Sequence, residues 1–286
     1  MRSTLMTLII AIALPLAAQT PLIDQGRALF EKRDFEHAAE VFEKAVAATP
    51  NNAEAHYLLG ATYGELTMKA GLFGQASLAS KTKDQFEEAV KLDPNHLDAR
   101  MGLLQFYAMA PILVGGSNAK AMEQAAEIKK RDALRGHGAF AFIYNHDKKP
   151  ELARKEYIDA VREQPSSPKA HISLATWYIT EKNFDAAAHE AEMAVKLDPK
   201  YMPGWFWIGR ISVGSGTNYA AGEEALRKYL TYTPKRDEPG LHRAHFWLGQ
   251  IYEKTGRKAE AKASYETSLK LRPDQKDVSE ALKRMS

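Results

Sequence analysis

The sequence predicts an all-α fold in which helical hairpins follow one another along the chain, and two observations predict it. Prolines repeatedly close segments of the same type, and Pro165 and Pro199 are separated by 34 residues. Nearly the same phrase precedes three of these prolines: KLDP ends at Pro94 and at Pro199, and KLRP ends at Pro273. A period of this length indicates that one supersecondary unit is repeated.

The first half of each unit predicts a helix with a small residue on its packing face. The segment AHYLLGATY at 55–63 recurs as AHISLATWY at 170–178 and as AHFWLGQIY at 244–252. In each segment a large apolar residue precedes a glycine or an alanine, and a tyrosine follows three residues later. The small residue allows a second helix to approach closely, and the tyrosine lies on the same face one turn further on.

The second half of each unit predicts an amphipathic helix that packs against the first. Ala38, Phe42 and Ala45 show the pattern, with apolar residues three and four positions apart. One such hairpin cannot bury its apolar face alone, so its neighbours must bury it, at about 25 cal/mol per Å² of apolar surface. We therefore assign the repeated tyrosines and alanines to packing.

Together these features resemble the tetratricopeptide-repeat family over essentially the whole chain beyond its first residues. The resemblance implies a right-handed α-solenoid of about seven stacked helix-turn-helix units with a C-terminal capping helix. The units are expected at about 19–52, 53–96, 97–132, 133–167, 168–201, 202–240 and 241–274, and the capping segment at 275–286. The third unit departs from the pattern, because it lacks a closing proline and has Leu104 at the small position.

The segment 1–18 has the features of a secretory signal peptide. Arg2 supplies a positive charge, residues 5–16 are apolar and uncharged, and Ala17 and Ala18 precede the expected cleavage site. The apolar stretch is too short to span a bilayer, although an uncleaved anchor is the alternative. We expect a bacterial protein that is exported to the periplasm or secreted, with no membrane span after cleavage. The chain contains no cysteine, which excludes disulfides and thiol chemistry.

Two insertions interrupt the period, near 66–80 and near 110–118. Both are expected at the turn between the two helices of a hairpin, so they should be neighbours on one edge of the stack. Their apolar residues can then meet, and the set is Leu72, Phe73, Ile112, Leu113 and Val114. Three interpretations remain open: a local mini-core, an apolar lip that binds a ligand, or a loop that touches a membrane.

The sequence does not predict catalysis, a metal site or a cofactor. His56, His137, His171 and His245 occupy one column of four units, but equivalent residues of adjacent helices lie roughly 10 Å apart. Zinc needs its nitrogen ligands within about 2.1 Å, so we interpret this column as packing residues. No esterase elbow or zinc-protease helix occurs. A net charge of +3 does not favour a nucleic-acid partner.

Members of the family usually bind a peptide on the concave face formed by the first helices of the hairpins. Aromatic residues and arginine are enriched among binding hot spots, and arginine can hold a carboxylate with two hydrogen bonds. On this chain the resemblance places at that face Arg135, Phe142, Asn145, Ile172, Thr176, Phe206, Arg210, Arg243, Phe246 and Gln250. The lysine–asparagine arrangement of the chaperone-binding members is missing from it.

The sequence therefore favours a non-catalytic periplasmic scaffold that binds a protein or peptide in a concave groove. The alternative is a receptor for an envelope glycan or lipid that uses the apolar insertions. Self-assembly or an unrecognised enzyme is a third hypothesis.

Overall fold

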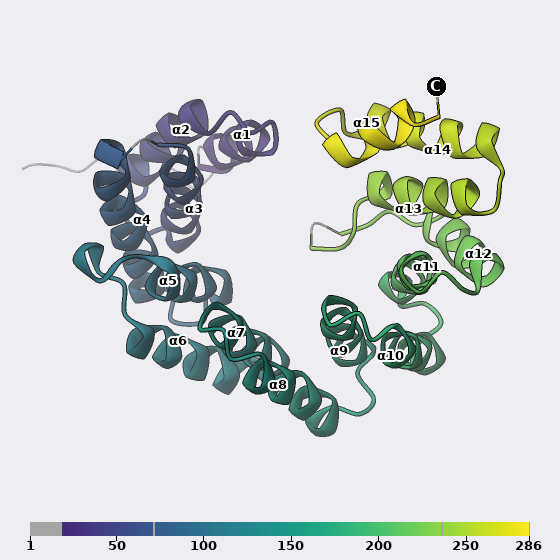
Figure 1. Cartoon of the computed structure of the whole chain (residues 1–286). Helices are drawn as coiled ribbons and strands as arrows, with labels where there is room; N and C mark the ends of the chain where they lie inside the picture. Colours follow the sequence, from purple (N-terminus) through teal and green to yellow (C-terminus); the bar gives the residue numbers. More distant parts are fainter. Residues whose placement is uncertain (1–18, 71, 236, 286) are drawn as a thin grey trace, which may run out of the picture. The chain divides into compact units, whose positions relative to one another are not determined.

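The computed structural model describes residues 19–70, 72–235 and 237–285, and the ordered elements in these ranges are helices (Figure 1). This confirms the all-α prediction. The predicted signal peptide at 1–18 lies outside the described residues. Within the described ranges no helix is both long and apolar enough to cross a bilayer. The chain forms two compact units that divide between residues 149 and 150, and each is described separately.

Unit 1 contains seven α-helices and one short 3-10 helix within its described residues. They are α1 (Gln19–Glu31), α2 (Phe35–Ala48), α3 (Ala53–Lys69), α4 (Leu72–Leu92), α5 (Leu97–Met109), η2 (Ile112–Val114), α6 (Asn118–Arg131) and α7 (Ala133–His146). Consecutive helices pack against each other throughout, and α5 also contacts α3 and α7. First helices of neighbouring hairpins therefore line up along the unit.

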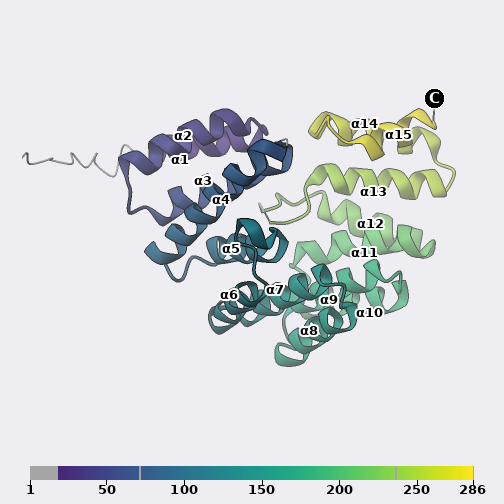
Figure 2. The ribbon, with the colours of Figure 1, turned by 60° about the vertical axis from the view of Figure 1, so that its left-hand side comes forward.

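Unit 2 has the same construction. Its helices are α8 (Pro150–Glu163), α9 (Pro168–Thr180), α10 (Phe184–Leu197), α11 (Met202–Ser215), α12 (Tyr219–Tyr229), α13 (Leu241–Lys254), α14 (Lys258–Leu271) and α15 (Lys276–Lys283). Figure 2 shows α11, α12 and α13 in successive layers, and α11 contacts both α9 and α13. The charged helix expected at the carboxyl end forms as α15, which packs on α14 and buries Val278.

An aromatic ring fills the gap that two glycines leave between three helices of unit 1. A Cβ atom at Gly60 of α3 would lie 2.9 Å from Phe86 of α4, and one at Gly102 of α5 would lie 2.6 Å from the same ring. Real Cβ contacts of this length essentially do not occur. Phe86 is 6% exposed and is held on both sides, so it cannot move aside. The expected close approach at Gly60 is therefore present.

A hydrogen bond that joins consecutive hairpins recurs in both halves of the chain. The proline that closes one hairpin provides the acceptor of this joint. The His56 Nε2–H donates to the Pro50 carbonyl at 2.9 Å, and the His171 Nε2–H donates to the Pro165 carbonyl at 3.0 Å. The Arg100 Nε–H donates in the same way to the Pro94 carbonyl at 2.7 Å, and Trp205 Nε1–H to the Pro199 carbonyl at 3.0 Å. Three residue types (histidine, arginine and tryptophan) thus make the same connection.

Three of these donors also contact the second helix of their own hairpin. The second ring nitrogen of His56 lies 2.7 Å from Gln85, and that of His171 lies 2.6 Å from the carboxylate of Glu190. Arg100 donates to Gln124 at 2.8 Å. The histidine column is thus a packing column, as the sequence predicts, and two of its members also hold consecutive hairpins together by hydrogen bonds.

Adding one methyl group at Gly102 is expected to destabilise unit 1, whereas the same change at Gly138 is not. Gly102→Ala overpacks the Phe86 site, which costs roughly 1–3 kcal/mol and outweighs the gain in helix propensity. A Cβ at Gly138 meets nothing within 4 Å, so Gly138→Ala should stabilise its helix by roughly 0.5–1 kcal/mol. Urea unfolding followed by circular dichroism measures both. Equal shifts for the two variants would contradict the close-packing argument.

Replacing His171 by leucine should destabilise unit 2, because it leaves the Pro165 carbonyl and the Glu190 carboxylate without their partner. The expected loss is roughly 1–3 kcal/mol. His171→Arg should retain most of the stability, since Arg100 makes the equivalent joint in unit 1. Thermal unfolding of the two variants tests this, and a leucine variant as stable as the arginine variant would argue against the joint.

Candidate functional site

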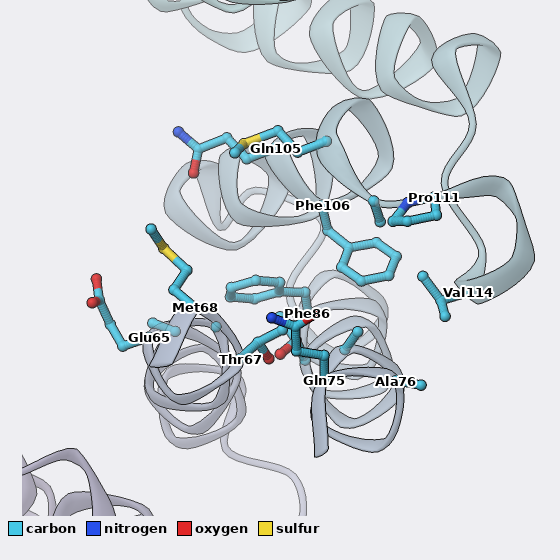
Figure 3. A pocket seen from close by; sticks show the side chains of 16 residues that line it. Glu65, Thr67, Met68, Gln75, Ala76, Phe86, Gln105, Phe106, Pro111 and Val114 are labelled. Atoms are coloured by element: carbon cyan, nitrogen blue, oxygen red, sulfur yellow. The ribbon is translucent and has the colours of Figure 1, made fainter. Parts of the chain in front are cut away.

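A pocket of about 530 Å³ opens in unit 1 between α3, α4, α5 and the turn that follows α5 (Figure 3). Its size falls within the range typical of sites for small ligands or for a few large side chains, about 300–1,000 Å³. The residues that line it are Ala61, Gly64, Glu65, Thr67, Met68, Gln75, Ala76, Ala79, Thr82, Phe86, Gln105, Phe106, Met109, Ala110, Pro111 and Val114.

The first insertion creates this pocket by lengthening two helices. α3 has 17 residues and α4 has 21, whereas α5 has 13 and α13 has 14. The extra residues were expected to form a loop, and that expectation is wrong: α3 continues to Lys69 and α4 begins at Leu72. Each added residue extends a helix by about 1.5 Å, so the two helices project past their neighbours and enclose the pocket with the turn after α5.

The walls of the pocket are apolar even where the residues are not. The Thr67 hydroxyl donates to the Tyr63 carbonyl at 2.7 Å, and the Thr82 hydroxyl donates to the Leu78 carbonyl at 2.8 Å. Both hydroxyls are therefore satisfied within their own helices. The rings of Phe86 and Phe106 also line the pocket (Figure 3). An apolar ligand is the kind that such walls favour.

The mouth of the pocket is different, because polar groups without partners and flexible methionines surround it. Figure 3 shows Glu65, Met68 and Gln105 together on one side of the opening. The Glu65 carboxylate and the Gln105 amide make no hydrogen bond or ion pair with any described residue. Met68 is 78% exposed and Met109 is 59% exposed. Methionine is adaptable and polarisable, and is common on surfaces that accept varied partners.

The second insertion forms the far wall. After α5 the chain makes the short helix η2 and turns at Gly115, whose φ of +103° favours glycine. A Cβ at Gly116 would lie 1.7 Å from the Ala110 carbonyl oxygen. The Ser117 N–H donates to the Tyr107 carbonyl at 2.8 Å, and the Ser117 hydroxyl accepts from the Lys120 N–H at 3.4 Å, which caps α6. Two glycines thus fix where the wall stands.

The five apolar insertion residues have different positions. Val114 lines the pocket, as the lip interpretation requires. Ile112 is 87% exposed and Leu113 is 99% exposed, so these two do not form the closed mini-core that the sequence left open. Leu72 and Phe73 begin α4, and their side chains lie outside the described part of the structure. The sequence missed Met68, Met109 and the phenylalanine walls, because it cannot show that the insertion lengthens helices.

Three of the residues expected at the concave face are core residues instead. Ile172, Phe206 and Phe246 are 6%, 3% and 7% exposed. The Phe206 ring packs 5.4 Å from Tyr229 of α12, and the Phe246 ring packs 6.1 Å from Tyr265 of α14. Their assignment to a partner surface is wrong, because all three side chains are buried, and the two phenylalanine rings pack against the second helix of their own hairpin.

The other expected groove residues are accessible, but most already have partners. Arg135 pairs with Asp98, Arg243 pairs with Asp277 at 2.7 Å, Gln250 donates to Tyr265 at 2.9 Å, and Thr176 donates to the Ser173 carbonyl at 2.7 Å. Phe142 is half-buried and Asn145 is exposed on α7. Arg210 is half-buried between Trp207 and Trp247. Burial, and then the nearby charge of Arg243, lower the pKa of Arg210.

Paired helices whose first members line up, with accessible side chains along them, define an α-helical repeat protein. Family models described as "TPR repeat" and "Tetratricopeptide repeat" match residues 26–66, 147–202 and 242–275. With the fold, these matches show that the chain belongs to the tetratricopeptide-repeat family.

Among curated proteins, the chain is similar to the mouse protein O-mannosyl-transferase TMTC3, with 24% identity over 86% of this chain and 27% of that protein. It is also similar to mouse superkiller complex protein 3, with 24% identity over 87% of this chain and 15% of that protein. The chain thus spans about a quarter or less of the length of these relatives.

Two solved structures share the fold. A tetratricopeptide-repeat protein from Parabacteroides merdae matches with a TM-score of 0.53 and 13% identity, covering 94% of this chain and 99% of that one. The human IFIT1 dimer with m7Gppp-AAAA matches with a TM-score of 0.58 and 18% identity, covering 93% and 63%. At these identities the likeness establishes the arrangement of helices alone.

Replacing Gly116 by alanine is expected to open the wall of the pocket, because the added Cβ atom has no room beside the Ala110 carbonyl. A local loss of about 1.4 kcal/mol speeds amide exchange about tenfold. We expect at least this change for the Ser117 amide, measured by hydrogen exchange. Leu113→Ala is the control, since that side chain is 99% exposed. Unchanged exchange in the Gly116 variant would contradict the role of the turn.

Proposed function

We propose that this protein is a non-catalytic scaffold of the bacterial periplasm that binds an apolar segment of a partner protein in the pocket of unit 1. The observation that carries the proposal is the apolar pocket with exposed methionines and unpartnered polar groups at its mouth. Tetratricopeptide-repeat proteins are in general scaffolds for protein partners, which supports this class of ligand. The chemistry of segment 1–18 supports export, and a chain without cysteine is indifferent to an oxidising compartment.

The charge at the mouth specifies the partner further. Glu65 is the one ionisable residue among the side chains that line the described pocket. Its unpaired carboxylate disfavours an anionic ligand and favours an ammonium, a guanidinium or an amide N–H beside the apolar group. The partner segment is therefore an amphipathic one, with apolar side chains that enter the pocket and a basic residue that meets Glu65. A helix presented to a groove in this way is a recurring mode of recognition.

The same lining supports a non-catalytic role. A lone carboxylate beside phenylalanine, alanine and internally bonded threonine does not provide the acid–base pair that most hydrolytic or transfer reactions need. The similarity to a mannosyl-transferase extends over 27% of that protein, at 24% identity. We infer that what the two proteins share is the helical repeat.

A receptor for a single-chain lipid is a second candidate, and the apolar walls favour it. An acyl chain fits such walls, whereas a glycan would need hydrogen-bonding side chains that the walls do not offer. Glu65 restricts the lipid to a neutral, zwitterionic or cationic head group.

Filling the pocket from its rim tests the proposal. Ala76 lines the pocket and is exposed on α4, so the ring in Ala76→Phe can enter without disturbing the core. Ser77→Phe is the matched control, because Ser77 is the next residue, is exposed, and does not line the pocket. The probes are fluorescein-labelled amphipathic peptides of about 15 residues, flanked by lysine or by glutamate, and binding is followed by anisotropy.

We expect the lysine-flanked peptide to bind more tightly than the glutamate-flanked one. Ala76→Phe should weaken binding at least about tenfold, as losing a central anchor site does, while Ser77→Phe leaves it unchanged. Absence of binding, or equal losses in both variants, would rule out the peptide site. Thermal stabilisation by lauroyl lysophosphatidylcholine without peptide binding would establish the second candidate instead.

A further inference from the structure

A half-buried cation without a counter-ion lies on the first-helix surface of unit 2. The guanidinium carbon of Arg210 is 5.1 Å from the ring centre of Trp207, on its own helix α11, and 5.5 Å from that of Trp247 on α13. Arg210 makes no hydrogen bond or ion pair with another residue in the described part of the chain. Two indole rings therefore hold the guanidinium, and none of its five N–H groups donates to a described residue.

A second guanidinium stands beside it. Arg243 lies 5.5 Å from the Trp247 ring centre and 4.9 Å from that of Phe246, so Trp247 is in contact with two arginines. Arg243 is held by Asp277 of α15, and this ion pair neutralises one of the two positive charges. The excess charge belongs to Arg210. The two like charges disfavour each other, and an anion between them would relieve that repulsion.

From this geometry we propose that Arg210, with Trp207 and Trp247, forms a binding site for a carboxylate of a peptide. A planar guanidinium presents two parallel N–H groups that match the two oxygens of a carboxylate. The indoles hold the guanidinium in place, lower its hydration and offer an apolar surface to the residue next to the carboxylate. The ligand is thus a peptide in which an acidic group adjoins an apolar or aromatic side chain.

This inference adds a second site to the proposed function and does not depend on the pocket of unit 1. In the competing, purely structural explanation, Arg210 serves only to join α11 to α13 through the two indoles. A structural role predicts changes in stability alone. A binding site predicts a carboxylate-dependent change in tryptophan fluorescence that the arginine fork controls.

The experiment titrates the full chain with short unlabelled peptides and records tryptophan emission. One peptide, acetyl-Gly-Ala-Leu-Glu-Leu-amide, carries a side-chain carboxylate. A second has Gln in place of Glu and a free carboxyl end, and a third has Gln and an amide end, so it carries no charge. The first two distinguish the sources of the carboxylate, and the third is the neutral control. Inorganic phosphate is titrated separately.

The variants are Arg210→Lys and Arg227→Lys. Lysine keeps the charge and loses the two-pronged donor. Arg227 is a matched control, because it also stacks on an aromatic ring, Tyr252 at 5.9 Å, but is already paired with Glu223 at 2.9 Å. We expect at least one carboxylate peptide to change the emission and the neutral peptide to leave it unchanged. Arg210→Lys should weaken binding at least about tenfold, because it removes one charge-assisted hydrogen bond.

Arg227→Lys and the pocket variant Ala76→Phe should bind the carboxylate peptide as the unaltered chain does. Equal affinity for the neutral peptide, equal affinity in Arg210→Lys, or no emission change with any peptide would overturn the proposal. Binding of phosphate in preference to every peptide would overturn it too. Failure of the labelled amphipathic peptides to bind, with carboxylate binding intact, would reject the pocket and leave this site standing.

Discussion

The structure of unit 1 depends on two glycines, whose lack of a side chain leaves room for one aromatic ring. Gly60 and Gly102 leave a space between α3 and α5, and the ring of Phe86 occupies it from α4. This one ring sets the distance between the first helices of two neighbouring hairpins. The same ring is also a wall of the pocket. Helix spacing and pocket shape therefore have a common cause, and a change that moves α4 alters both.

The two candidate sites have opposite chemical character. The pocket is apolar and has one unpaired carboxylate at its mouth, from Glu65. The surface around Arg210 is aromatic and has one unpaired guanidinium among the described residues. In both places the protein leaves a single charge unsatisfied next to apolar surface, where a partner can meet it under reduced screening. Most other charged side chains named in the site analysis have partners, so these two differ from the ordinary surface.

Much of the fold could be predicted from the sequence, because the repeat makes a weak signal appear several times. The phrase before Pro94 and Pro199 locates two helix ends, and the small residue at Gly60 indicates where helices pack closely. Periodicity alone did not show which residues of the first helices are accessible and which are buried. Phe206 is next to Trp207 in the sequence, and a rotation of about 100° between adjacent residues of a helix separates a core position from an accessible one.

The insertions show a different limit of prediction from the sequence. Counting residues between Pro50 and Pro94 detects extra chain, but the count does not tell whether that chain forms a loop or extends a helix. The apolar residues that mattered for the pocket include Met68 and Met109, which read in the sequence as ordinary helix formers. Their exposure follows from how far the helices project, which is a property of three-dimensional packing.

The joints between units have a consequence for how such a chain can change over time. Their acceptor is a backbone carbonyl, as at Pro50 and Pro94, and their donor has been a histidine, an arginine or a tryptophan. Because the fixed half of the connection carries no side-chain identity, this hydrogen bond places no demand on which residue a new neighbour offers. A boundary made by recombination then has to match in packing, as Phe86 and Gly102 do, but not in the acceptor of the joint.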